Sequence, residues 1–175
     1  MDAFSKEMTN LRVAFDILKD GDRAPIGHKQ INCNLIYDVK MEDFRRKARL
    51  VAGGHMTETP KCMTYSSVVG RETVHISLTI AALNKLQVKA GDIINAYVTA
   101  PCSEKIWNIL GKEFGSDQGK KAIIVRAIYR IKSSDVAFHA HLAECMRSMG
   151  YTPFRGENYL WMKPEIDPDG DEYYS

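Results

Sequence analysis

The sequence has no apolar run approaching the roughly 18 residues that a membrane-spanning helix needs. Its beginning, MDAFSKEMTN, also lacks the apolar core of a secretory signal peptide. The cysteines are too widely spaced for a zinc knuckle or a redox pair: Cys33, Cys62, Cys102 and Cys145. These absences predict a protein that is neither secreted nor membrane-spanning and that resides in a reducing intracellular compartment.

The sequence also lacks a large excess of charge of either sign, because the net charge is only +2. Any affinity for nucleic acid therefore has to come from a local patch and not from a global field. One such patch lies at residues 40–49, which hold five basic residues and two acids. The opposite imbalance occurs at residues 165–175, with five acids and no base. With 45% apolar residues, the 175-residue chain can form the core of one domain, or of part of a larger one.

The spacing of apolar residues predicts a mixture of helices and strands. Helices are expected at residues 2–10, 71–86 and 134–149, and the middle one is apolar on nearly all sides, which predicts that it is buried. Strands are expected at residues 13–18, 35–39, 45–52, 87–93, 105–110, 122–128 and 159–162, with a further strand starting at residue 172.

The strands at 35–39 and 45–52 are separated by a short polar turn and predict a β-hairpin. Because side chains alternate across a strand, the small and apolar residues share one face: Ala48, Leu50 and Ala52. The basic residues share the other, which predicts a continuous cationic face: Arg45, Lys47 and Arg49. Such a face is also typical of a solvated edge strand protected by charge. Lys47 and Arg49 flank one small residue, a pattern that favours a polyanion such as triphosphate.

The segment QVKAGDIINAYVTAP predicts a short buried strand that runs directly into Asp92. An unpaired buried carboxylate is costly, so packing explains it poorly, whereas a Mg²⁺ ion explains it well. Tyr97 follows five residues later, and a carboxylate at a strand end beside a flat aromatic suits a nucleotide-binding metal site. The alternative is that Asp92 is a capping or structural residue.

Three other motifs favour ordinary structure over chemistry. GSDQGKK has the wrong glycine spacing for a phosphate-binding loop and precedes a strand instead of a helix. Asp167, Asp169 and Asp171 resemble the start of a calcium loop, but a proline intrudes and the closing glutamate is absent, so a turn is expected. His141 and Cys145 have metal-ligand spacing on one helix, yet Cys145 falls on the apolar stripe.

Four segments occur in an informative order: RRKARLVAGGH at 45–55, TYSSVV at 64–69, AGDIINAYVTAP at 90–101 and IYRIKSS at 128–134. Together they resemble the reverse transcriptase of copia-type LTR retrotransposon Pol polyproteins, over essentially the whole chain. The resemblance implies an α+β fold: a polymerase fingers-and-palm fragment with an antiparallel sheet, helices packed on one face and no thumb. It assigns fingers to residues 1–70 and 101–131, and palm to residues 71–100 and 132–175.

The resemblance also implies roles for individual residues. Asp92 matches the first catalytic carboxylate, which binds Mg²⁺, and the backbone of Ile93 would help to position the triphosphate. Tyr97 matches the aromatic residue that packs under the incoming sugar and excludes a 2′-hydroxyl. Lys47 and Arg49 match the basic fingers strand over the triphosphate. Lys132 lies in the stretch that lines the templating and nucleotide pocket. The implied partners are an RNA or DNA template–primer and a dNTP.

The sequence departs from the family in several places. The family's other two carboxylates lie in a Tyr-x-Asp-Asp turn, and this sequence stops at Ser175 before such a turn. Neither Asp38 nor Asp135 lies at a matching place, so the expectation is that the 175 residues do not polymerise. Arg130 stands where the family has glycine, Asp135 where a small residue or proline is usual, and Ile94 where glutamine is common.

Three hypotheses remain open on the sequence alone. The first is a reverse transcriptase fragment, found in a cytoplasmic particle or the nucleus, without the RNase H and integrase segments of such polyproteins. The second is a non-catalytic remnant of a decayed transposable element whose basic hairpin still binds nucleic acid. The third is a domain that folds and has no function.

Overall fold

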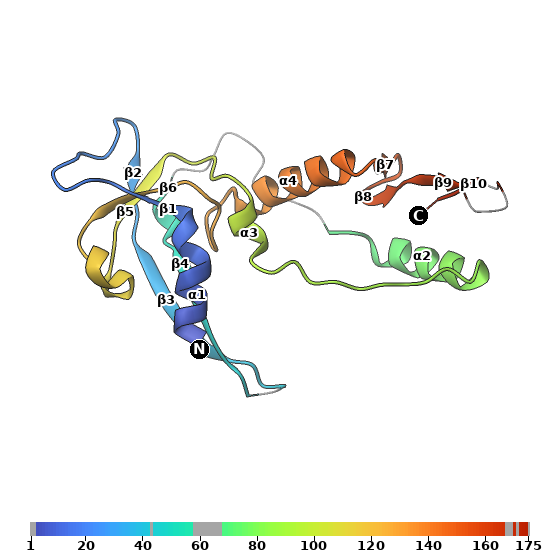
Figure 1. Cartoon of the computed structure of the whole chain (residues 1–175), viewed down its shortest axis with the longest axis horizontal. Coiled ribbons are helices and arrows are strands. Elements are labelled where there is room, and N and C mark those ends of the chain that lie inside the picture. The colour runs from blue at the N-terminus through green and yellow to red at the C-terminus, as the bar shows by residue number, and fades with distance from the viewer. Residues whose placement is uncertain (1–2, 43, 58–67, 167–169, 171, 175) are drawn as a thin grey trace. The chain divides into compact units, whose positions relative to one another are not determined.

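The computed structural model describes residues 3–42, 44–57, 68–166, 170 and 172–174 (Figure 1). The chain divides into two compact units. Unit 1 comprises Met1–Tyr65 and Asn95–His139, and unit 2 comprises Ser66–Ile94 and Ala140–Ser175. Helix α4 (Ser134–Ser148) begins in unit 1 and ends in unit 2. The fingers and palm boundaries stay a prediction.

Unit 1 is built on a small sheet with strand order β1-β6-β5-β2. Its pairs are antiparallel except β2 with β5, which is parallel. The strands are β1 (Phe15–Ile17), β2 (Lys29–Gln30), β5 (Ile106–Ile109) and β6 (Lys121–Ile124). A separate antiparallel hairpin joins β3 (Cys33–Val39) to β4 (Arg46–Ala52), and helix α1 (Ala3–Leu11) contacts β4. The α+β class is confirmed.

The core of unit 1 follows from strand alternation and one helix face. Leu50 and Ala52 of β4 pack with Leu11 at the end of α1. The sheet contributes Phe15, whose ring meets that of Phe114 edge-on at 5.0 Å between centroids. Further core residues come from the strands and from the loop that follows β6: Ile106, Leu110, Ala122, Ile124, Ile128 and Ile131.

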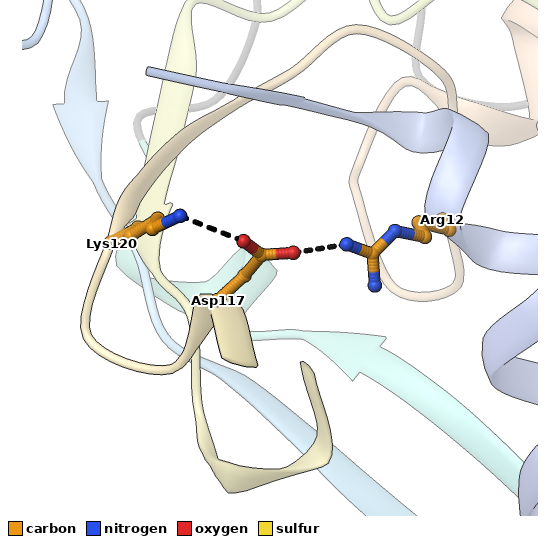
Figure 2. A network of polar contacts seen from close by, with 3 residues as sticks. All are labelled: Arg12, Asp117 and Lys120. Atoms are coloured by element: carbon orange, nitrogen blue, oxygen red, sulfur yellow. Dashed lines mark hydrogen bonds and ion pairs between the residues drawn. The ribbon is translucent and has the colours of Figure 1, made fainter. Parts of the chain in front are cut away.

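An ion-pair network holds the start of unit 1 to the connection between β5 and β6 (Figure 2). Arg12, in the 3-10 turn η1 (Arg12–Ala14), and Lys120 both contact Asp117, which ends η3 (Lys112–Asp117). Lys120 Nζ lies 2.9 Å from Asp117 Oδ1. Its hydrogen bond, followed by that of Arg12, keeps the pKa of Asp117 below the ordinary value, so the network persists at neutral pH and is lost in acid.

Unit 2 consists of helices and two short hairpins. Helix α4 ends where Gly150 adopts φ +90°, and the N–H of Tyr151 then donates to the carbonyl of Met146, as glycine-terminated helices commonly do. The elements are α2 (Arg71–Leu83), β7 (Thr152–Phe154), β8 (Glu157–Met162), β9 (Pro164–Ile166) and β10 (Glu172–Tyr174). Strand β7 pairs with β8, and β9 with β10, both antiparallel. No helix in the described part of the chain combines the length and apolar content required to cross a bilayer.

Two expectations for unit 2 were wrong. Residues 87–93 form no strand: they have no regular secondary structure and are exposed. A strand needs a partner for its N–H and C=O groups, and the described strands of unit 2 pair with one another instead. Helix α2 is formed as predicted but is not buried, since its branched apolar side chains are between 40% and 78% exposed: Val74, Ile76, Leu78, Ile80 and Leu83.

The other predicted elements of the described chain are present, with small shifts at their ends. The turn Pro168-Asp169-Gly170 and the aspartates of the calcium-like motif fall largely outside the described residues, as does most of the segment at 64–69.

Candidate functional site

Strand β4 presents Lys47 and Arg49 on the face opposite Ala48, Leu50 and Ala52, as the alternation predicts. Both side chains are half-buried. The register of the hairpin places Asp38 directly opposite Lys47, and Ile36 opposite Arg49. Residues directly opposite in an antiparallel pair share a face. The face is therefore less uniformly cationic than predicted, because β3 brings an acid next to Lys47.

A second acid approaches the same strand from helix α1. Glu7 Oε1 accepts a hydrogen bond from the backbone N–H of Leu50 at 3.1 Å. Burial raises the pKa of Glu7, and this effect outweighs the opposing ones of the Leu50 N–H, Lys47 and Arg49. Glu7 thus both satisfies an outward-facing N–H of β4 and lies within electrostatic reach of the two basic side chains.

Arg49 and Tyr97 come together on one aromatic side chain, Tyr129. The guanidinium carbon of Arg49 lies 5.7 Å from the centroid of the Tyr129 ring, a cation–π distance. The Tyr97 ring meets the Tyr129 ring edge-on at 5.1 Å and 86°. It also meets the Phe138 ring edge-on at 6.2 Å and 87°. Arg49 and Tyr97, far apart in the sequence, therefore border one aromatic cluster in unit 1.

Tyr97 is further fixed by its hydroxyl group, which donates a hydrogen bond to Asp135 Oδ1. This bond, together with burial, raises the pKa of Tyr97 to about 12. Tyr97 lies in the single turn α3 (Ala96–Thr99), which begins after Asn95 in the left-handed conformation (φ +54°). Asp135 lies in the first turn of α4. The phenol is thus held between two elements of unit 1.

Lys132 lies near this cluster on the loop that joins β6 to α4. Its ammonium group donates to the backbone carbonyl of Thr57 at 2.6 Å, and Thr57 follows the turn η2 (Gly54–Met56). One of the three ammonium donors is therefore engaged within the protein. On the same loop, the carbonyl of Tyr129 accepts the N–H of Ala52 at 2.9 Å, so the loop extends the outer edge of β4.

The backbone of Gly54 packs against that of Arg130 with no space for a side chain. A Cβ atom added to Gly54 would lie 1.9 Å from the carbonyl oxygen of Arg130 and 3.0 Å from its carbonyl carbon. Arg130 itself has φ +69°, a backbone conformation that residues other than glycine rarely adopt. Arg130 is therefore held in a backbone conformation that glycine usually adopts.

Asp92 and Ile93 lie in unit 2, in the exposed segment without regular structure. The predicted buried strand end is thus absent, and the physical argument that burial makes Asp92 costly does not apply. The role of Asp92 as a metal ligand stays a prediction. Within the residues that the structure describes, no three His, Cys, Asp or Glu side chains are grouped so as to hold a metal ion.

Sequence reasoning did not identify Tyr129, Glu7 or Phe138 as parts of the site. Phe138 was predicted only as part of an apolar stripe, although its spacing of three residues from Asp135 places both on one side of α4. The sequence feature that could have drawn attention to Tyr129 is the unusual arginine at the next position, Arg130. Nothing in the sequence links Glu7 to β4.

Comparison with protein families places these observations in context. A family model described as Reverse transcriptase (RNA-dependent DNA polymerase) matches residues 17–167. The matched region includes all six of the residues predicted for the site: Lys47, Arg49, Asp92, Ile93, Tyr97 and Lys132. No curated protein and no solved structure matches the chain. Because the family model covers most of the sequence, the chain belongs to the reverse transcriptase (RNA-dependent DNA polymerase) family.

Proposed function

We propose that the chain is the reverse transcriptase segment of a copia-type LTR retrotransposon polyprotein, and that the surface around Tyr129 binds an incoming dNTP. The observation that carries the proposal is the convergence of Arg49 and Tyr97 on the Tyr129 ring. A guanidinium group binds the charged phosphates of a nucleotide, and a flat aromatic ring packs against its uncharged sugar. Arg49 and Tyr97, which both contact Tyr129, provide these two groups.

In this proposal, Lys47 and Arg49 hold the triphosphate, and the ammonium group of Lys132 adds to the positive field. The Tyr97 ring packs against the sugar and leaves no room for a 2′-hydroxyl. Asp92 is an exposed carboxylate, and oxygen donors of this kind suit Mg²⁺. When bound, Mg²⁺ would stabilise negative charge on the reacting phosphate.

The proposal predicts that a polypeptide of these 175 residues does not extend a primer when assayed alone. Only Asp92 matches a family carboxylate, and one carboxylate does not hold the two metal ions of phosphoryl transfer. The assay is primer extension on an RNA or DNA template with Mg²⁺ or Mn²⁺. Template-dependent incorporation that survives Asp92→Asn would contradict both the predicted inactivity and the role of Asp92.

A specific observation also supports the second candidate, a non-catalytic nucleic-acid-binding remnant. The end of the β3–β4 hairpin exposes large apolar side chains among its basic residues: Tyr37, Val39, Met41 and Phe44. Aromatic and basic side chains together suit a single strand, because bases stack on the rings while cations follow the phosphates.

Binding of a fluorescent primer–template distinguishes the candidates. We expect Lys47→Ala plus Arg49→Ala to weaken binding about tenfold at low salt and to reduce the slope of log K against log salt by about 2. Anisotropy titrations at several salt concentrations measure both. The matched control is Lys19→Ala plus Arg23→Ala, which removes the same charge from exposed positions of unit 1.

The two candidates differ in their response to nucleotide. For a reverse transcriptase segment, the complementary dNTP with Mg²⁺ tightens the complex in the unaltered chain and not in the Lys47/Arg49 variant. For a remnant, the dNTP has no effect, although the salt dependence remains. Equal binding by the unaltered chain, the double variant and the control would contradict a role of the basic hairpin in both candidates.

A further inference from the structure

Asp135 makes a specific contact with a residue of the proposed site without belonging to the basic strand or to the loop of Lys132. Its Oδ1 accepts the hydrogen bond of the Tyr97 hydroxyl. The two residues lie on different elements, α3 and α4, so the bond is not a local consequence of helix formation. Carboxylate acceptors form the stronger class of hydrogen bond.

The position of Asp135 suits a carboxylate acceptor. It lies in the first turn of α4, where the partial positive charge of the helix N-terminus favours an anion. Its neighbours Ser133 and Ser134 already have their own partners: the hydroxyl of Ser133 donates to Glu104 at 2.9 Å, and that of Ser134 to the carbonyl of Ile128 at 2.7 Å. The start of the helix is thus held by other contacts, and Asp135 Oδ1 is directed at Tyr97.

The Tyr97 ring is consequently restrained on three sides. Tyr129 and Phe138 meet it edge-on, and Asp135 holds its hydroxyl. A side chain excludes a ligand group sterically only if it does not rotate away from that group. The discrimination against a 2′-hydroxyl is therefore limited by the free energy needed to move the Tyr97 ring. The hydrogen bond at the tip of the ring adds a directional restraint to the two ring contacts.

We infer that Asp135 is the positioning residue of Tyr97: its carboxylate holds the phenol ring in one orientation and thereby sets how strongly the chain discriminates between deoxyribo- and ribonucleotides. The restraint on the Tyr97 ring involves only the two side chains. The effect on nucleotide discrimination rests on the proposed function, in which the Tyr97 ring packs against the sugar.

The first test is spectroscopic and needs no nucleotide. Tyrosine labelled with ¹³C at Cζ reports each phenol separately, and Tyr97→Phe identifies the Tyr97 signal among the eight tyrosines. At about pH 11, one unit above the ordinary tyrosine pKa of about 10, exposed phenols ionise and Tyr97 is expected to remain protonated. Asp135→Ala should shift the signal at neutral pH and let Tyr97 ionise at a lower pH, whereas Asp135→Asn, which keeps an acceptor, should give an intermediate result.

The matched control is Asp38→Ala, which removes an exposed aspartate of the β3–β4 hairpin and should leave the Tyr97 signal unchanged. Far-ultraviolet circular dichroism at each pH verifies that the fold persists. A Tyr97 that titrates with the ordinary tyrosines in the unaltered chain, or identically in Asp135→Ala, would overturn the inference.

The second test measures equilibrium binding of a non-hydrolysable dNTP analogue and of its ribonucleotide counterpart. We expect Asp135→Ala to lower the preference for the deoxy form about two- to tenfold, the range for losing one hydrogen bond, with partial recovery in Asp135→Asn. The same preference in Asp135→Ala and in the unaltered chain would refute the specificity role and leave the proposed function standing. If the unaltered chain binds neither nucleotide, the proposed function fails, and the spectroscopic test alone decides the Asp135–Tyr97 contact.

Discussion

Gly54→Ala is expected to lower the free energy of unfolding by about 3 kcal/mol, the upper part of the range for overpacking a tight site. The added methyl group would lie 1.9 Å from a backbone carbonyl oxygen, that of Arg130, which has no side-chain rotamer with which to move aside. The loop of Arg130 is held in turn by the Ala52–Tyr129 and Lys132–Thr57 hydrogen bonds. Thermal unfolding should show a midpoint lower by about 6–12 °C for a chain of this size.

Gly91→Ala is the matched control, because a Cβ there would meet nothing within 4 Å and the backbone is not left-handed. Its effect should stay within about 1 kcal/mol. Combining Gly54→Ala with Arg130→Gly should recover part of the loss, since glycine frees the backbone that has to shift. A Gly54→Ala protein as stable as the unaltered chain would show that the two loops do not pack as described.

Asn108→Leu is expected to raise the free energy of unfolding by about 1–3 kcal/mol, the usual penalty for burying an amide without hydrogen bonds. Asn108 on β5 is 1% exposed, and neither its Oδ1 nor its Nδ2 has a partner among the described residues. Its neighbours on the same strand face, Ile106 and Leu110, are core residues. Leucine has a similar shape, so it should fill the site without strain. Chemical denaturation with a two-state fit gives the change directly.

Two further substitutions serve as comparisons, one at Asn108 itself and one at an exposed asparagine. Asn108→Asp should destabilise the protein, because it places a charge where the amide already lacks partners. Asn34→Leu, at an exposed position of β3, should change stability by no more than about 0.5 kcal/mol. If Asn108→Leu instead lowers stability, the amide is hydrogen-bonded in solution.

The parts of the fold that the sequence predicted are those determined by local pattern. The β3–β4 hairpin follows from alternation and one turn, and its register buries Ala48 and Leu50 as expected. Helix α4 has serines at its start and Gly150 at its end, so both termini were predictable. In each case the residues that decide the structure lie within a few positions of one another.

The failures concern contacts with distant partners. Apolar and polar side chains alternate along residues 87–93 as they do in a strand. A strand forms only where another strand pairs with it, and the sequence of the segment does not determine its pairing partner. Helix α2 carries apolar residues on all sides, which predicts burial, but burial also requires a packing surface. The local amino-acid pattern indicates that a strand requires a pairing partner or that a helix requires a packing surface. It does not indicate whether the described chain provides one.

The candidate site shows the same division. Arg49 and Tyr97 were predicted from the resemblance, and the structure places both against Tyr129. Tyr129 and Asp135 became recognisable as partners of Tyr97 only from three-dimensional contacts, because each lies more than thirty positions along the chain from it.

The contact between α1 and β4 has a consequence for ligand selectivity. Glu7 lies within electrostatic reach of Lys47 and Arg49, so its carboxylate, when ionised, would offset part of their charge before any ligand arrives. An incoming anion has to compete with a carboxylate that belongs to the protein. A singly charged anion would gain little from that exchange. The triphosphate of the proposed function, with several charges and a base and sugar to contact other surfaces, would still have a net advantage. In the proposed function, the Glu7 carboxylate on helix α1 would therefore disfavour the binding of singly charged anions.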